Sequence, residues 1–119
     1  MLTVYGIPNC DTIKKTLNWL KANQIEFQFH DYRKEGISEE KLNDWLAQVP
    51  LEKLFNKAST TFKELPDEVK PTVGDPAVAV QLMQEKTSVI KRPVVEKDGK
   101  VLAVGFKPDQ YKAIFTPEA

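Results

Sequence analysis

The feature that most constrains the fold is a switch of hydrophobic period within the first 32 residues of the chain. Residues 2–5 form a short β-prone run that ends at Gly6. In residues 12–23, apolar side chains recur at the i, i+4 and i+7 spacing of one helix face. Residues 25–32 then alternate apolar with polar side chains, as a half-buried strand does. These segments predict a β-α-β unit, in which two parallel strands are joined by a right-handed crossover.

The rest of the chain predicts helices followed by a β-hairpin. Ser38 is a suitable N-cap for one helix, and Asp75, followed by a proline, is suitable for another. Two β-rich runs flank Asp98-Gly99, a dipeptide typical of two-residue hairpin turns. A short helix is expected to begin at Pro108. The element order is therefore β-α-β, a helical block, and β-β-α.

This order predicts an α/β protein with a thioredoxin-like fold, β-α-β then β-β-α around a mixed sheet. We expect one domain over residues 1–119, with a helical insertion of about fifty residues at approximately 34–87. Pro93 supports this fold. A proline inside a strand removes a ladder hydrogen bond and is therefore uncommon there. Thioredoxin-type folds place a cis-proline at the start of the third strand. We therefore expect the peptide bond between Arg92 and Pro93 to be cis.

Composition limits the possible functions. The chain has 17 basic and 17 acidic residues, so no global field attracts nucleic acid or an anionic membrane. One cysteine cannot form an internal disulfide, which favours a reducing, cytoplasmic setting. One Cys and one His are too few for the usual zinc sites, and we expect no metal. We also expect a monomer.

The single cysteine, Cys10, lies at the turn between the first strand and the first helix. Free backbone N–H groups and the helix dipole favour an anion there, and the thiolate is the nucleophilic form of cysteine. Asp11 opposes this, because it disfavours a second negative charge beside it, whereas Lys14 and Lys15 offset it. The alternative is an inert cysteine that packs as a small hydrophobic residue. The residues alone leave both interpretations open.

Three stretches, "YGIPNCDTIKKTLNWL", "IKRPVV" and "VGFKPDQY", carry a family resemblance. In this order and spacing they resemble the ArsC/Spx family of thioredoxin-fold proteins, and most closely its YffB-type bacterial subgroup of glutathione-dependent thiol reductases. The likeness covers essentially the whole chain, including the helical insertion. The resemblance implies that Cys10 is the nucleophile and that Arg92 faces it.

The sequence also departs from the patterns of this family. Its glutaredoxin-linked arsenate reductases surround the cysteine with three arginines, of which only Arg92 is present here. Asn56 and Lys107 stand at the other two positions, and lysine lacks the bidentate fork that suits an oxyanion. Gly6 replaces a histidine of the arsenate reductases. Ile13 stands where the redox-switch regulators have a second cysteine, which excludes an internal CxxC switch.

These residues predict a monothiol oxidoreductase, a thiol/disulfide reductase with glutathione as co-substrate. A mixed disulfide at Cys10 needs an external thiol to resolve it, because the chain has no second cysteine. Two alternatives are an arsenate reductase with a weakened oxyanion site and a non-catalytic Spx-like adaptor that binds RNA polymerase. Expected partners are glutathione and glutaredoxin or a glutathionylated substrate, without nucleic acid or membrane. The predicted catalytic residues are Cys10 and Arg92, and the predicted glutathione-binding residues are Asn9, Asp11, Thr12, Pro93 and Lys107.

Overall fold

The computed structural model describes residues 2–115, which group into two compact units. The two ends of the chain, up to Tyr32 and from Arg92 onward, form the first, which we call the sheet unit. Residues 33–91 form the second, the helical unit. That the two fold as a single domain stays a prediction. Among the described residues, no helix combines the length and the apolar character that crossing a membrane requires.

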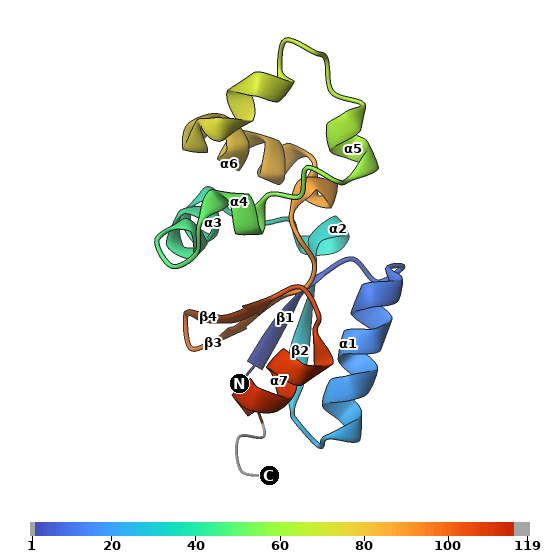
Figure 1. The fold of residues 1–119 in the computed structure, drawn as a ribbon. Helices are drawn as coiled ribbons and strands as arrows, with labels where there is room; N and C mark the ends of the chain where they lie inside the picture. The colour runs from blue at the N-terminus through green and yellow to red at the C-terminus, as the bar shows by residue number, and fades with distance from the viewer. Residues whose placement is uncertain (1, 116–119) are drawn as a thin grey trace. The chain divides into compact units, whose positions relative to one another are not determined.

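The sheet unit contains a four-stranded mixed sheet with the strand order β2-β1-β3-β4 (Figure 1). Strand β1 is parallel to β2 and antiparallel to β3, and β3 is antiparallel to β4. This confirms the predicted α/β, thioredoxin-like arrangement. The elements of the unit are β1 (Leu2–Gly6), α1 (Asp11–Ala22), β2 (Phe27–Asp31), β3 (Val94–Lys97), β4 (Lys100–Val104) and α7 (Pro108–Phe115).

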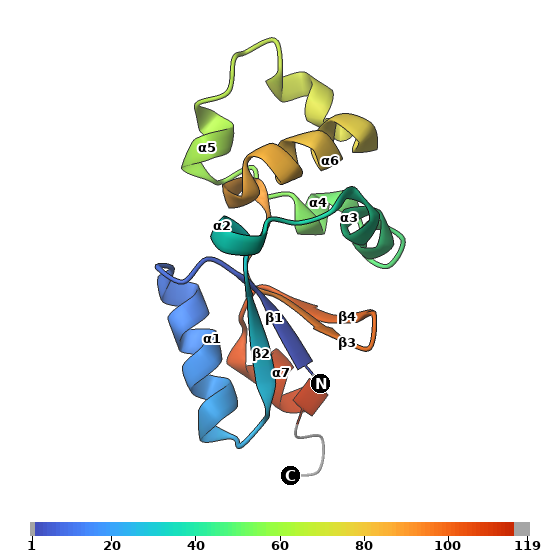
Figure 2. The same cartoon turned by 180° about the vertical axis from the view of Figure 1, so that it is seen from behind.

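Helices α1 and α7 cover one face of this sheet. Val4 of β1 and Val95 of β3 are fully buried there, together with Leu20 of α1 and Tyr111 of α7. Helix α7 lies in front of the strands in Figure 1 and behind them in Figure 2. Fully burying one aliphatic side chain contributes about 1.5–3 kcal/mol, so this face is the main source of stability for the unit. The Tyr111 hydroxyl also donates to the Gly105 carbonyl at 2.8 Å, which anchors α7.

The opposite face of the sheet carries polar and aromatic side chains. Because side chains alternate along a strand, Tyr5 of β1 shares this face with His30 of β2, which is its register partner. Glu96 of β3 lies there too, as the register partner of Thr3. Tyr5 is 7% exposed and Glu96 is 5% exposed, and the Tyr5 hydroxyl donates to Glu96 Oε1 at 2.9 Å. This face therefore holds a buried hydrogen-bonded pair that joins β1 to β3.

The helical unit is built around the packing of two capped helices, α3 and α6. Ser38 caps α3, with its hydroxyl oxygen accepting from the Lys41 N–H at 3.1 Å. Asp75 caps α6, with its carboxylate accepting from the Ala77 N–H at 3.0 Å. Both N-caps are those that the sequence predicts. The elements of the unit are α3 (Glu39–Leu46), α4 (Leu51–Leu54), α5 (Thr60–Lys63), η1 (Lys70–Gly74), α6 (Pro76–Glu85) and η2 (Thr87–Val89), after α2 (Tyr32–Glu35), which begins at the last residue of the sheet unit.

Strand β2 is shorter than the alternating pattern of residues 25–32 predicts. The Ile25 N–H donates to the Leu20 carbonyl at 2.9 Å, and Gln24 has a left-handed φ of 58°, so Ile25 belongs to the end of α1. At the other end of the strand, Tyr32 begins the short helix α2. The alternation of apolar and polar side chains correctly predicted a strand here. Its first residue, however, is determined by the hydrogen bonds at the end of α1.

Candidate functional site

The sheet register brings the predicted site residues to one end of the sheet. Gly6, the last residue of β1, pairs with Asp31, the last residue of β2. Tyr5 pairs with Val94, the first residue of β3, and Val94 also pairs with Val104, the last residue of β4. The segments that follow β1, β2 and β4 and the segment that precedes β3 therefore all leave the sheet at this end, which we call the site end.

Four predicted residues lie on these segments. Cys10 follows β1, Arg92 and Pro93 precede β3, and Lys107 follows β4. Pro93 is buried, Arg92 is half-buried and Lys107 is exposed. The Arg92–Pro93 peptide bond is cis, and the Pro93 carbonyl accepts from the Gly105 N–H at 2.8 Å. Residues far apart in the sequence thus converge at the site end.

Cys10 is the N-cap of α1. Its backbone is extended, with φ −110° and ψ 129°, and its carbonyl accepts from the Lys14 N–H at 3.0 Å. Its side chain makes no capping hydrogen bond and is half-buried. The thiol therefore lies beside the unpaired N–H groups of the first turn, whose partial positive charge favours an anion. The local fold leaves this thiol available for chemistry.

The other predicted glutathione-binding residues flank Cys10 in the sequence. Asn9 is exposed in the turn before α1, and Asp11 is exposed as the first residue of the helix. Thr12 is half-buried, and its carbonyl accepts from the Thr16 hydroxyl at 2.7 Å. Their part in ligand binding stays a prediction.

Gly6 and Ile13 occupy one packing site between β1 and α1. A Cβ atom built on Gly6 would overlap Cδ1 of Ile13, which has no exposed area. A histidine at position 6 would meet the same side chain. The two departures from the family patterns at these positions are therefore physically linked, because the Ile13 side chain fills the space that a larger residue at position 6 requires.

Asn56, which stands at an arginine position of the arsenate reductases, lies in the helical unit. Its backbone N–H donates to the Val89 carbonyl at 2.6 Å, and its Oδ1 accepts from the Ala58 N–H at 3.1 Å. The side chain thus closes a local turn. An amide in this arrangement carries no charge for an oxyanion.

Sequence reasoning missed a cluster on the polar face of the sheet, which we call the tyrosine cluster: Tyr5, His30, Tyr32 and Glu96. The ring centroids of Tyr5 and His30 are 4.7 Å apart, and those of Tyr5 and Tyr32 are 6.3 Å apart. The His30 and Tyr32 rings meet edge to face at 5.9 Å. Strand alternation places His30 on the polar face with Tyr32 two residues later, but Tyr5 and Glu96 come from other strands, and only the register brings them to this face.

Tyr32 is the most buried residue of this cluster. The residue is 3% exposed, and its hydroxyl has no hydrogen-bond partner among the described residues. Burial is the main cause that raises the pKa of Tyr32 well above the ordinary tyrosine value. The neighbouring Tyr5 and Glu96 raise this pKa as well, whereas the positive charge of Arg92 lowers it.

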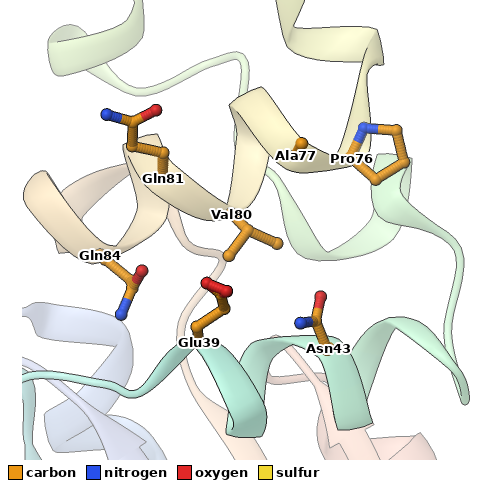
Figure 3. Close-up of a pocket in the computed structure, with 7 residues that line it drawn as sticks. All are labelled: Glu39, Asn43, Pro76, Ala77, Val80, Gln81 and Gln84. Carbon is orange, nitrogen blue, oxygen red and sulfur yellow. The ribbon is translucent and has the colours of Figure 1, made fainter.

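The helical unit has a separate pocket of about 410 Å³ (Figure 3). Glu39 and Asn43 of α3 and Gln81 and Gln84 of α6 supply its polar groups, with Val80 between them. This volume lies within the range of small-molecule sites, but no predicted site residue lines the pocket. Across residues 2–115, no three His, Cys, Asp or Glu side chains gather in a way that could hold a metal ion.

Comparison with known proteins shows which family this chain belongs to. The sequence model of the ArsC family matches residues 5–114. The chain belongs to the ArsC family. A solved protein named YFFB is 42% identical to this ArsC-family chain, with a TM-score of 0.89 over 96% of this chain and 98% of its own. An arsenate reductase (ArsC) related protein from Brucella melitensis is 52% identical, with a TM-score of 0.77 over 96% and 93% of the two chains. The regulatory protein MgsR of Bacillus subtilis is 32% identical over 92% of this chain and 86% of its own.

Proposed function

We propose that this ArsC-family protein is a monothiol oxidoreductase that reduces disulfides with glutathione and uses Cys10 as its nucleophile. The observation that carries the proposal is the position of Cys10, the N-cap of a 12-residue helix, with a thiol that takes no part in capping. Family membership supports it, as does the convergence of Arg92 and Lys107 on the same end of the sheet. A reducing compartment such as the cytoplasm would supply the glutathione.

In the first step, the Cys10 thiolate attacks the glutathione sulfur of a glutathionylated substrate. A disulfide bond forms between Cys10 and glutathione while the substrate–glutathione disulfide breaks. The substrate sulfur leaves with the electron pair of that bond and takes a proton from solvent. The N–H groups at the start of α1 favour the attacking anion, because their partial positive charge faces it.

In the second step, a glutathione thiolate attacks the glutathione sulfur bound to Cys10. Oxidised glutathione leaves, and the Cys10 thiolate is restored. The substrate disulfide has then gained two electrons, and two glutathionyl groups have become one disulfide. An external thiol is needed because this chain has only one cysteine.

Arg92 and Lys107 have binding roles in this proposal. Glutathione carries two carboxylates, and a guanidinium forms paired, charge-assisted hydrogen bonds with such a group. Lys107 is exposed and would add a mobile positive charge. Asn9, Asp11, Thr12 and Pro93 would line the path to the thiol, mainly through backbone groups beside Cys10.

The direct test is turnover of a glutathionylated peptide with reduced glutathione as the only reductant. We expect wild type to release free peptide thiol with ping-pong kinetics, because a covalent intermediate separates the two thiols. Cys10→Ser should be inactive, and Thr16→Ser, a conservative change on the same helix, should stay active. Activity in Cys10→Ser equal to that of wild type would contradict the proposal.

The relative named as a regulatory protein favours a second candidate, a transcriptional adaptor of the Spx type that binds RNA polymerase. Binding by such an adaptor would not require turnover. A complex with polymerase that forms equally with wild type and Cys10→Ser would support this function. Arsenate reduction is a weaker candidate, because Asn56 and Lys107 replace two arginines of the oxyanion site that the resemblance implies.

A further inference from the structure

Two hydrogen-bond donors near the site end have no partner in the described chain. The first is the Tyr32 hydroxyl, which is buried and unpaired among residues 2–115. The second is the guanidinium of Arg92, which is half-buried and forms no hydrogen bond or ion pair with another residue of the described chain. Most buried polar groups in proteins are paired, so the buried Tyr32 hydroxyl is suited to an acceptor from outside the described chain, and the half-buried guanidinium is accessible to the same acceptor.

The register brings these two donors to the same end of the sheet. Tyr32 directly follows the last residue of β2, and Arg92 lies two residues before the first residue of β3, so both lie at the site end. The positive charge of Arg92 also lowers the pKa of Tyr32, which agrees with this placement. One acceptor bound at this end of the sheet would satisfy both donors.

The nearby groups indicate the charge of that species. The guanidinium is always positive, so it favours an anionic acceptor. Glu96 places a carboxyl group in the same cluster, beside Tyr5, and a second negative group weakens the attraction for a multiply charged anion. A planar carboxylate fits better than an arsenate ion, because it carries one charge and matches the fork of an arginine.

We propose that Tyr32 and Arg92 form one subsite for a carboxylate of the thiol co-substrate, with the hydroxyl and the guanidinium each donating a hydrogen bond to it. This inference rests on the proposed function. It adds Tyr32 as a residue that binds the co-substrate and does not act on the Cys10 thiol. Because the Tyr32 hydroxyl is covered in the structure, its ring has to shift as the carboxylate enters.

The matched pair Tyr32→Phe and Tyr5→Phe tests this subsite. Each change removes one buried hydroxyl, but the Tyr5 hydroxyl is already bonded to Glu96. With reduced glutathione and a glutathionylated peptide, Tyr32→Phe should raise KM for glutathione about tenfold or more, the effect of one charge-assisted hydrogen bond. Its melting temperature should be unchanged or higher, because no bond within the chain is lost. Tyr5→Phe should lower the melting temperature and leave KM for glutathione unchanged.

A thiol without carboxylates completes the test. With 2-mercaptoethanol as the reductant, kcat/KM for this thiol depends only on the second step and should be equal in wild type and Tyr32→Phe, because the attacking thiol has no carboxylate for the subsite to bind. An unchanged KM for glutathione in Tyr32→Phe, or an equal loss with both thiols, would overturn the subsite while leaving the proposed function intact. Wild type that turns over with neither thiol would instead overturn the proposed function, and this inference with it.

Discussion

Replacing Gly6 by alanine should destabilise the fold, although the new methyl group is small. The added Cβ would overlap Cδ1 of Ile13, which is fully buried and cannot turn toward solvent. Over-packing of this kind costs about 1–3 kcal/mol. A glycine-to-alanine change also restricts the unfolded chain, which returns about 0.4–1 kcal/mol. We therefore expect a net loss of up to about 2.6 kcal/mol in the free energy of unfolding.

The double variant Gly6→Ala/Ile13→Val shows whether these two atoms are responsible. Ile13→Val removes the δ-methyl group that meets the new Cβ, and alone it should cost about 0.5–1.5 kcal/mol. In the double variant the overlap with Cδ1 is gone, and only Cγ1 of residue 13, at 3.0 Å from the new Cβ, remains in tight contact. Its loss should therefore be smaller than the sum of the single losses, by about 1 kcal/mol.

Urea unfolding followed by far-UV circular dichroism measures all four proteins of this cycle. Additive losses would mean that Gly6 and Ile13 do not share one packing site. A Gly6→Ala variant that is more stable than wild type would mean that the unfolded-chain effect exceeds the steric one. Either result would refute the packing link between these positions.

Three further predictions concern stability and rate. Tyr111→Phe should lower the free energy of unfolding by about 1–2 kcal/mol in urea unfolding, because the hydroxyl loses its bond to the Gly105 carbonyl. Burial raises the pKa of Tyr111, so this tyrosine ionises in the unfolded chain at a lower pH than in the folded protein. Its contribution to stability should therefore be constant below about pH 10 and fall above it. Melting temperatures between about pH 8 and 11 would show this fall, which should be smaller in Tyr111→Phe. Arg92→Lys keeps a charge but loses the fork, so glutathionylation of Cys10 should slow by about 10-fold to 150-fold at fixed pH. Arg92→Ala should slow it at least as much, and equal rates in all three proteins would make Arg92 a structural residue.

Local signals in the sequence predicted the parts of the fold that short-range physics determines. Asp98 and Gly99 have φ angles of 53° and 83°, the left-handed pair that a two-residue hairpin turn of this type requires. Asp75 and Ser38 cap the helices that follow them, because each side chain bonds to a nearby backbone N–H. These contacts lie within three residues, so the sequence shows them directly.

The partners in the tyrosine cluster could not be predicted in this way. Tyr5 and Glu96 are 91 residues apart in the sequence, and only the antiparallel pairing of β1 with β3 brings them together. Glu96 is 5% exposed although it carries a carboxyl group, and nothing in the neighbouring sequence indicates that burial. The predicted site came from the family resemblance, which implies that Arg92 faces Cys10. The register places the segments that carry both residues at one end of the sheet, and their pairing stays a prediction.

The central claim is that Cys10 cycles between a thiolate and a mixed disulfide with glutathione. Intact-mass spectrometry after treatment with oxidised glutathione tests this most directly. The account predicts an adduct of one glutathione on Cys10, absent in Cys10→Ser and removed by excess reduced glutathione. A folded wild-type protein that forms no adduct, or one whose adduct reduced glutathione does not release, would contradict the claim.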